Sequence, residues 1–336
     1  MSLDVFVCGP GFGETIVLRW QENGKTCGAL VDAYAGARGL PLINWLKDLG
    51  IESLAFVVVT HPHLDHFWNL HSVIVHFAGK VDVMWWWGGL QSSYYIAYFN
   101  HLKTVCPASG NDLGRRARQL ELLFKKRRKV FQAYGKPALE NVLGVETLYP
   151  FGDEPKGISI SSFSPWQGSL DKFTRIVRAG TEECRVEDNH QEANLASLGL
   201  IIRFGEAQVV LGGDVEEENW KSFRQSGHCS SLTPCLVKVS HHGSQNGTIG
   251  GMWTSGGFFS SRKPPIAVIT PYRGLLPQKQ IVQDIRRAGC RVFVTGQPLP
   301  GQDIRPWKSF VHFCVDETGN AKPVNRGPNI AEYDPL

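Results

Sequence analysis

Three histidines and one aspartate lie within six residues of each other, in a segment that contains His61, His63, Asp65 and His66. Neutral imidazoles and carboxylates are the ligands that borderline divalent metal ions accept. The segment follows directly on the apolar run Leu54–Thr60, which predicts a strand that holds it rigidly. His61 and His63 can face one metal ion. Asp65 and His66 can turn toward a second ion, so the spacing predicts two metal sites.

A further candidate ligand follows another apolar run, Gln208–Gly212, which also predicts a strand. Gly213 lets the backbone pass close to a ligand, and Asp214 then stands at the tip of the strand. A carboxylate in that position is suited to bridge two metal ions. Asp214 can also cap the N-terminus of a helix that begins at Val215, and the two roles are compatible.

Two adjacent histidines, His241 and His242, follow the predicted strand Cys235–Ser240. One imidazole of the pair can bind the second metal ion. The other can contact substrate or protonate a leaving group, because an ordinary histidine pKa of about 6.5 suits either task. The alternation of side chains along a strand does not decide between them. Both histidines are therefore candidate catalytic residues, together with Asp65.

The rest of the chain alternates apolar runs rich in β-branched residues with helical patterns. The other strands predicted are Glu14–Trp20, Gly28–Asp32, Gly157–Phe163, Leu198–Arg203, Ala267–Thr270, Arg291–Thr295 and Ser309–Val315. The helices predicted include Leu40–Leu49, Val215–Phe223 and Pro277–Ala288. This order indicates a single α/β domain over residues 1–320, with an insertion at about 81–150. An extended C-terminal tail is expected over 321–336.

Taken together, these motifs resemble the metallo-β-lactamase superfamily, and more narrowly its ComEC-like branch, named for a DNA-uptake competence protein. The resemblance rests on the histidine segment, on the Gly213-Asp214 tip and on residues 238–244, Lys-Val-Ser-His-His-Gly-Ser. An early turn that contains Asp32 adds to it. The similarity covers roughly residues 11–79 and 157–296.

The resemblance implies an αββα sandwich with two divalent metal ions at one edge, between the two sheets. It also implies a third imidazole on the first metal, for which His190 is the candidate. The donor set suits zinc, with manganese and iron as alternatives. Relatives commonly follow the histidine motif with Ile-Gly-Gly, whereas this chain has Phe67-Trp68-Asn69. We therefore expect a narrower or aromatic pocket floor.

The insertion carries a basic helical stretch and an aromatic run. Four basic residues are candidate contacts to nucleic-acid phosphates, namely Arg115, Arg118, Lys125 and Arg128. The alternative is a solvated helix face whose charges pair with nearby acids. The run Trp85–Trp87, with Tyr94 and Tyr95, could stack on bases, but such clusters more often lie in a core or an oligomer interface. The insertion is also a candidate docking site for a partner protein.

The composition limits the classes of protein that remain. A formal net charge of +4 over 336 residues is too small to identify a nucleic-acid partner by itself. The eight cysteines form no CxxC pair, which argues against a disulfide scaffold or a zinc knuckle. A secretory leader and a long uncharged apolar run are both missing, so we expect a cytoplasmic protein without a membrane anchor.

The function expected from these features is two-metal hydrolysis of a phosphodiester in nucleic acid, because the family branch and the basic helix agree. Soluble relatives of this branch also occur among bacterial defence genes, so the resemblance makes cleavage of self or phage DNA one role to expect. One alternative is a hydrolase of a small ester, lactone or phosphorylcholine-type substrate, with the aromatic cluster as its pocket. Another is a binding or regulatory protein whose metals are structural. The sequence leaves the oligomeric state open.

Overall fold

The computed structural model describes most of the 336 residues of the chain. The described residues are 1–11, 13–34, 40–87, 93–105, 112–134, 140–149, 157–182, 190–249, 252–253, 259, 263–296, 309–328 and 330–336.

Eight of the described strands form one mixed sheet, in the order β15-β14-β1-β2-β3-β4-β5-β6. Their bounds are β1 Ser2–Cys8, β2 Thr15–Glu22, β3 Lys25–Ala33, β4 Leu54–Val59, β5 Val81–Trp87, β6 Glu140–Val142, β14 Phe310–Asp316 and β15 Ala321–Arg326. β3, β4, β5 and β6 run parallel. The carboxyl ends of β3 and β4 therefore lie at the same edge of the sheet.

Eight more described strands form the second sheet, in the order β16-β13-β12-β11-β10-β9-β8-β7. Their bounds are β7 Glu146–Tyr149, β8 Ile158–Ser164, β9 Gly199–Phe204, β10 Ala207–Leu211, β11 Leu236–Lys238, β12 Ile266–Ile269, β13 Val292–Thr295 and β16 Ile330–Tyr333. The four strands β10 to β13 run parallel, so the loops that follow them also leave from one edge. Their continuous apolar runs suit strands that are covered on both faces.

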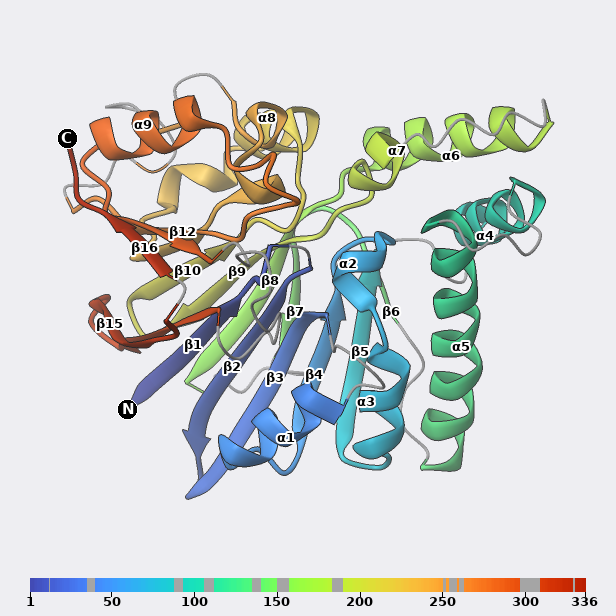
Figure 1. Ribbon diagram of the computed structural model, residues 1–336, viewed down its shortest axis with the longest axis horizontal. Helices are drawn as coiled ribbons and strands as arrows, with labels where there is room; N and C mark the ends of the chain where they lie inside the picture. Colours follow the sequence, from blue (N-terminus) through green and yellow to red (C-terminus); the bar gives the residue numbers. More distant parts are fainter. Residues whose placement is uncertain are drawn as a thin grey trace.

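Helices cover the outer face of each sheet (Figure 1). They are α1 Leu40–Asp48, α2 Leu64–Phe67, α3 Leu70–His76, α4 Ser93–Val105, α5 Asp112–Ala133, α6 Gln167–Glu182, α7 His190–Asn194, α8 Glu217–Gln225 and α9 Lys279–Arg287, with short 3₁₀ turns η2 His228–Ser231, η3 Ser240–Gly243 and η4 Gln245–Gly247. α8 and α9 pack on the second sheet, while α1 and α3 lie on the first. The predicted four-layer αββα sandwich is confirmed.

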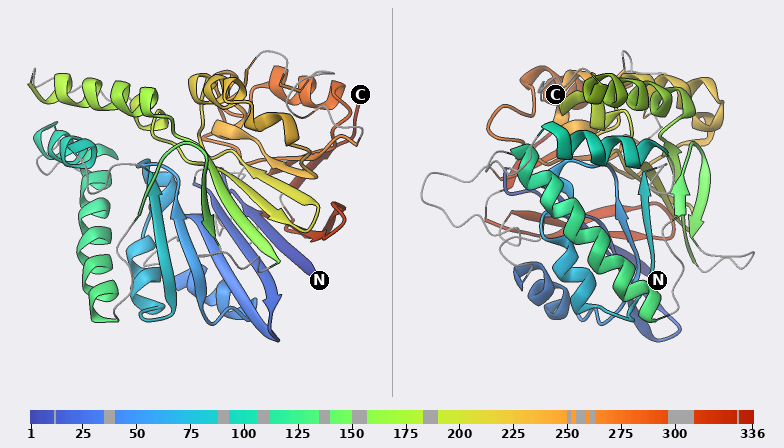
Figure 2. Two further views of the ribbon diagram at one scale, coloured as in Figure 1. Left: turned by 180° about the vertical axis from the view of Figure 1, so that it is seen from behind. Right: turned by 90° about the vertical axis from the view of Figure 1, so that its right-hand side faces the viewer.

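The long helix α5 stands outside α2 and α3, and α4 packs against α6 in an arm that projects from the sandwich (Figure 2). α5 spans 22 residues, and charged side chains cover its solvent face. Within the described ranges, no helix combines the length and the apolar character that crossing a bilayer requires.

The hydrophobic core has two parts. One cluster of buried side chains fills the space between the sheets and continues under α1, α3 and α5. A second cluster lies between the outer face of the second sheet and the helices α8 and α9. The metal-ligand candidates stand at the edge of this sandwich rather than inside it, because the strands that carry them end there.

The first strand of the expected insertion belongs to the central fold. β5 pairs with β4 in parallel, and all three tryptophans Trp85–Trp87 are fully buried. The ring of Trp86 packs against Phe124 of α5, with centroids 5.2 Å apart. The interpretation as core is confirmed for these three residues, which therefore offer no surface for bases or for a partner. The side chains of Tyr94 and Tyr95 lie outside the described part of the chain.

The stretch from 321 to 336, expected as an extended tail, instead supplies two strands. β15 pairs with β14, and β16 pairs with β13, so each sheet gains an edge strand. The ion pair between Arg326 and Glu332 connects the two. Most side chains of β15 and β16 are exposed. The two segments therefore need no alternation of apolar and polar residues, which is the pattern that normally indicates a strand. Both strands form through backbone pairing with a neighbouring strand, and no sequence pattern indicates that pairing.

Replacing Trp86 with alanine tests its place in the core. We expect the free energy of unfolding to fall by about 3–5 kcal/mol, because a large buried ring is lost and a cavity remains. Trp86→Phe, which keeps an aromatic ring, should cost clearly less. Urea denaturation of the three proteins measures the difference. A Trp86→Ala protein as stable as the parent would contradict the buried position.

Candidate metal centre

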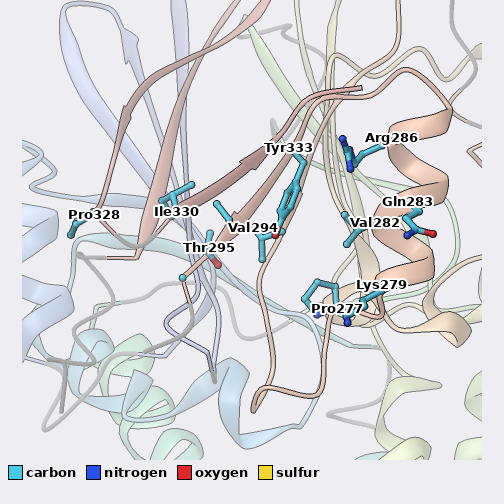
Figure 3. A pocket seen from close by; sticks show the side chains of 12 residues that line it. Pro277, Lys279, Val282, Gln283, Arg286, Val294, Thr295, Pro328, Ile330 and Tyr333 are labelled. Carbon is cyan, nitrogen blue, oxygen red and sulfur yellow. The ribbon is translucent and has the colours of Figure 1, made fainter. Parts of the chain in front are cut away.

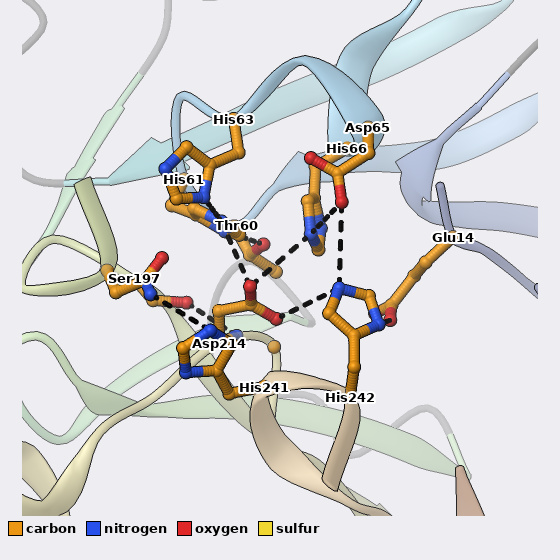
Figure 4. Close-up of polar contacts among 12 residues, drawn as sticks. Glu14, Thr60, His61, His63, Asp65, His66, Ser197, Asp214, His241 and His242 are labelled. Atoms are coloured by element: carbon orange, nitrogen blue, oxygen red, sulfur yellow. Dashed lines mark hydrogen bonds and ion pairs between the residues drawn. The ribbon is translucent and has the colours of Figure 1, made fainter. Parts of the chain in front are cut away.

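The predicted ligands follow the ends of strands that meet at one edge of the sandwich (Figure 4). The segment after β4 carries His61 and His63 and enters α2, which carries Asp65 and His66. The tip after β10 carries Asp214, and the turn η3 after β11 carries the two adjacent histidines. Because both sheets contribute, the site lies across the junction of the two halves of the chain.

A first group consists of His61, His63 and Asp214. The Nε2 atom of His61 lies 2.8 Å from Nδ1 of His63 and 3.5 Å from Oδ2 of Asp214. One potential ligand atom from each residue falls within 4.8 Å of the others. All three side chains are buried. This clustering is the arrangement that a single divalent cation requires.

A second group consists of Asp65, His66 and His242. The Oδ2 atom of Asp65 lies 3.6 Å from Nε2 of His66 and 3.6 Å from Nε2 of His242. Asp214 reaches this group as well, because its carboxylate oxygens lie 3.8 Å from Nε2 of His66 and 3.7 Å from Nε2 of His242. The Asp214 carboxylate therefore stands between the two groups, in the position of a bridging ligand.

Buried polar atoms at the centre test whether cations fit there. Among the described residues, Nε2 of His66, Nε2 of His242 and Oδ1 of Asp214 have no hydrogen-bond partner, although all three atoms are buried. A buried polar atom without a partner costs roughly 1–3 kcal/mol. Nε2 of His242 lies 3.7 Å from Oδ1 of Asp214, and Nε2 of His66 lies 3.8 Å from the other oxygen of this carboxylate, Oδ2. These distances are too long for hydrogen bonds and are suited to sharing a cation. The residues present fit a pair of divalent ions.

The pKa values agree with this interpretation. Burial lowers the pKa of both His61 and His63 well below the usual range, so these imidazoles are neutral and ready to bind a metal. Burial alone would raise the pKa of Asp65 and Asp214, but the neighbouring histidines hold both pKa values below the ordinary one. Burial also disfavours a charge on His66, yet three carboxylates, led by that of Asp32, raise its pKa to about 10.

Asp32 supports this centre from beneath. Its carboxylate is fully buried and accepts hydrogen bonds from the Thr60 backbone N–H at 2.7 Å and from the Thr60 hydroxyl at 2.8 Å. Nδ1 of His66 lies 2.8 Å from the same carboxylate. This contact keeps a proton on Nδ1 of His66 and directs Nε2, the atom that would bind a metal, toward the second group. Asp32, in the early turn noted in the sequence, is therefore a hydrogen-bond partner of the candidate metal ligand His66.

The two adjacent histidines point to different sides. Whereas His242 faces the second group, Nδ1 of His241 lies 3.3 Å from Glu216 and its Nε2 lies 3.3 Å from the amide nitrogen of Asn194. Both histidines have left-handed backbones, with φ of 46° and 54°. Such conformations cost roughly 1–2 kcal/mol in residues other than glycine. Burial lowers the pKa of His241, but Asp214 and Glu216 outweigh it and raise the pKa.

Small residues shape the tip that carries Asp214. Gly213 has a φ of +50°, and a Cβ atom there would meet the Leu198 carbonyl oxygen at 2.6 Å. The Ser197 hydroxyl accepts a hydrogen bond from the Asp214 backbone N–H at 2.9 Å. α8 starts at Glu217, so Asp214 is not its N-cap. The alternative role considered from the sequence is therefore wrong.

The remaining predicted residues have different outcomes. His190 is the first residue of α7, and its side chain lies outside the described part of the chain, as do residues 183–189 before it. Phe67 is buried and packs toward Trp86, with ring centroids 6.2 Å apart, so it belongs to the core beneath the centre.

The four basic candidates on α5, namely Arg115, Arg118, Lys125 and Arg128, are all exposed. Lys125 forms an ion pair with Glu121 one turn away, at 2.8 Å. The first turns of α5 lie beside the centre, because α5 packs against α2 and the Gln119 side chain accepts a hydrogen bond from the Asn69 backbone N–H at 3.3 Å. Arg116 is buried, hydrogen-bonds the Tyr98 hydroxyl at 2.9 Å and contributes to the lowered pKa of His63.

Sequence reasoning missed Glu14, Glu216 and Thr270 as supporting residues. Glu14 and Lys238 form a fully buried ion pair at 2.5 Å, and the Thr270 hydroxyl donates to the same glutamate at 2.8 Å. The sequence does contain two indications of this pair, namely a glutamate directly before an apolar strand, Glu14, and a lysine inside another strand, Lys238. A charge in such a position needs a buried partner, but the sequence does not name it.

A separate hollow of about 750 Å³ lies between α9 and the strands β13 and β16 (Figure 3). Its lining includes Lys279, Arg286 and Tyr333. The Arg286 side chain donates to the Asp334 carbonyl oxygen at 2.6 Å and lies over the Tyr333 ring. None of its lining residues belongs to the two ligand groups.

Comparison with known proteins gives remote structural likenesses. No family model matches the sequence, and no curated protein matches it. Human tRNase Z, short form, has 9% identity and a TM-score of 0.40, with 80% of this chain and 92% of that chain covered. Zn²⁺-bound PqqB from Methylobacterium extorquens has 10% identity and a TM-score of 0.40, with 84% and 85% covered. A mutant metallo-beta-lactamase from Cronobacter sakazakii has 8% identity and a TM-score of 0.34, with 69% and 75% covered.

The raised pKa of His66 gives a test in metal-free protein. Because the folded-state pKa of about 10 exceeds the ordinary value of 6.5, the stability that this group contributes is fully present below pH 6.5 and is lost as the pH rises through about 10. We expect ¹⁵N imidazole spectra at pH 8 to show His66 protonated on both nitrogens. Asp32→Asn should lower that pKa. A neutral His66 at pH 8 in metal-free parent protein would contradict this electrostatic picture.

Proposed function

We propose that this chain is a metal-dependent phosphodiesterase of the metallo-β-lactamase superfamily, which binds two divalent metal ions and hydrolyses nucleic acid. The observation that carries the proposal is the position of Asp214 between two groups of ligating atoms. Membership of the ComEC-like branch, inferred from the motifs around Asp65, Asp214 and His242, is part of the same proposal.

The first ion would be held by His61, His63 and Asp214, with His190 as the candidate for a further imidazole. The second ion would be held by Asp65, His66 and His242, with Asp214 shared between the two. Imidazole and carboxylate donors suit Zn²⁺, and Mn²⁺ or Fe²⁺ accept the same set. Bound there, two divalent ions would make water acidic enough to attack at neutral pH and would stabilise charge on the phosphoryl oxygens.

His241 is positioned to handle a proton of the reaction. Its ring is partly exposed at the edge of the centre, with a side-chain exposure of 18%, so substrate can reach it. Burial lowers its pKa, but Asp214 and Glu216 outweigh burial and raise the pKa, which favours the protonated ring. Glu216 is itself held by the amides of Asn194 and Asn246, each at 2.9 Å. We assign His241 as the donor of a proton to the leaving oxygen.

Nucleic acid is the substrate that the surroundings of the centre favour. The exposed cations of α5 begin beside the centre at Arg115 and continue to Arg128, about 20 Å along a helix that rises 1.5 Å per residue. Lys126 and Lys129 are exposed on the same helix. Cations spaced along a surface neutralise successive phosphates, the main source of nucleic-acid affinity. A small ester or phosphorylcholine would use none of them, and Trp85–Trp87, which that alternative needed, are buried.

Removal of the shared ligand tests the catalytic proposal. Asp214→Asn should lower kcat/KM on bis-p-nitrophenyl phosphate and on DNA or RNA by more than the roughly 10–100-fold that changes beside a metal ligand produce. Asp284→Asn, the same change at a half-exposed carboxylate of α9 outside the two ligand groups, should leave activity intact. Loss of activity on chelation and its return with Zn²⁺ or Mn²⁺ are expected too. Turnover of lactones or thioesters without any phosphodiester cleavage would refute the substrate assignment.

Salt dependence of binding tests the role of α5. Substituting Arg115 and Arg118 with glutamine should weaken nucleic-acid binding at every sequence tested. It should also reduce the slope of log K against log salt by about one for each lost phosphate contact. Lys263→Gln, which removes a cation bonded to Asn320 at the far side of the fold, serves as the matched control. An unchanged slope in the α5 variant would show that nucleic acid does not follow this helix.

A further inference from the structure

We propose that Thr270, Glu14 and Lys238 are positioning residues for the second ligand group, which they prepare by fixing the tautomer and orientation of His242. The inference rests on the proposed function, because it assigns a purpose to a network around the metal centre. The network is buried completely: Thr270, Glu14 and Lys238 each have a relative exposure of 0%.

The hydroxyl of Thr270 has one proton, and it donates that proton to Oε2 of Glu14 at 2.8 Å. Its oxygen therefore faces Nδ1 of His242, 3.1 Å away, as an acceptor. The Thr270 carbonyl oxygen lies 2.8 Å from the same nitrogen and is also an acceptor. Two acceptors place the imidazole proton on Nδ1. The lone pair of Nε2 is then directed at Asp65 and Asp214, as a metal ligand requires.

The same arrangement occurs on the other side of the centre. The Thr60 hydroxyl donates to Oδ2 of Asp32, and its oxygen lies 3.0 Å from Nδ1 of His61. A buried carboxylate thus orients a threonine hydroxyl, which in turn orients an imidazole, once in each ligand group. This repetition of carboxylate, threonine and histidine in two unrelated segments indicates a shared requirement of the two groups rather than local packing.

Lys238 completes the network by pairing with Glu14. Its ammonium lies 2.5 Å from Oε2 of Glu14 and donates to the Gly213 carbonyl oxygen at 3.2 Å. A carboxylate paired in this way only accepts hydrogen bonds, so the Thr270 hydroxyl must donate to it. The bond to Gly213 holds the backbone directly before Asp214. One ammonium therefore acts on His242 through Thr270 and on the bridging carboxylate through the main chain.

Glu14 also joins the two halves of the second group. It directly precedes β2 of the first sheet, whereas Lys238 ends β11 and Thr270 follows β12 of the second. The backbone N–H of Glu14 donates to the Asp65 carbonyl oxygen at 3.1 Å. Its main chain thus holds Asp65 while its side chain holds His242 through Thr270. The distance between ligands from different sheets depends on this residue.

The test compares Thr270→Val, which removes the hydroxyl at nearly constant shape, with Thr270→Ser, which keeps it. Calorimetric titration of metal-free protein with Zn²⁺ measures both equivalents, and ¹⁵N imidazole spectra of the metal-free form report the His242 tautomer. We expect the parent and Thr270→Ser to bind two equivalents and to show a proton on Nδ1. Thr270→Val should weaken one equivalent by about 10–100-fold, leave the other, and give mixed tautomers of His242.

A second variant, Glu14→Gln with Lys238→Met, removes both charges together, so that neither remains buried alone. It should weaken most the equivalent that Thr270→Val weakens, with a smaller effect on the other, because Lys238 also holds the backbone before the shared Asp214. Melting in the presence of chelator checks that each variant is folded. Two equivalents of parental affinity and an unchanged tautomer in both variants would overturn the inference and leave the proposed function standing. Equal weakening of both equivalents by Thr270→Val would overturn the assignment to the second group. A parent protein that binds no metal would refute the proposed function, and the inference with it.

Discussion

The carboxylate of Asp214 lies between 3.5 and 3.8 Å from imidazoles of His61, His66 and His242, which come from both sheets. A carboxylate this buried is stable only beside positive charge, which protons on histidine or bound cations can provide. The elements around Asp214 meet this constraint. The glycine at 213 lets the tip pass the chain at Leu198, and the strands that end here bring the imidazoles within reach.

Surrounding contacts hold the centre in conformations that the local sequence disfavours. His241 and His242 are consecutive left-handed residues, and the backbone N–H of His241 donates to Gly213 at 2.9 Å. The Gln278 N–H donates to Gly243 at 3.1 Å and ties the end of the turn to the start of α9. Strain of this kind persists only where neighbours fix it from several sides. It separates the two rings, so that one faces the metal groups and the other faces Glu216.

The apolar runs predicted an α/β domain with candidate ligands at its strand ends, because parallel, doubly covered strands have distinctive apolar runs. β4 and β10 are examples. The αββα sandwich itself was implied by the resemblance of the motifs to a known superfamily. The sequence did not distinguish His241 from His242, since that choice depends on backbone angles that no pattern encodes. It also missed Glu14, whose partners Lys238 and Thr270 lie more than 200 residues away along the chain. β16 was missed because it is only four residues long, its side chains alternate between partly buried and exposed, and its pairing comes from β13.

The charges that would hold metals and those that would hold nucleic acid are separated in space, and this separation matters for the proposed reaction. Carboxylates concentrate in the buried centre, whereas the exposed cations of α5 lead away from it, from Arg115 toward Arg128. The small net charge of +4 therefore does not show that acidic groups are concentrated at the centre and basic groups along α5. Duplex DNA has one phosphate per 3.4 Å of each strand, so about 20 Å of helix faces roughly six phosphates. A polymer bound as proposed would gain affinity far from the bond to be cut, and the ligand groups would act on a single phosphate among many.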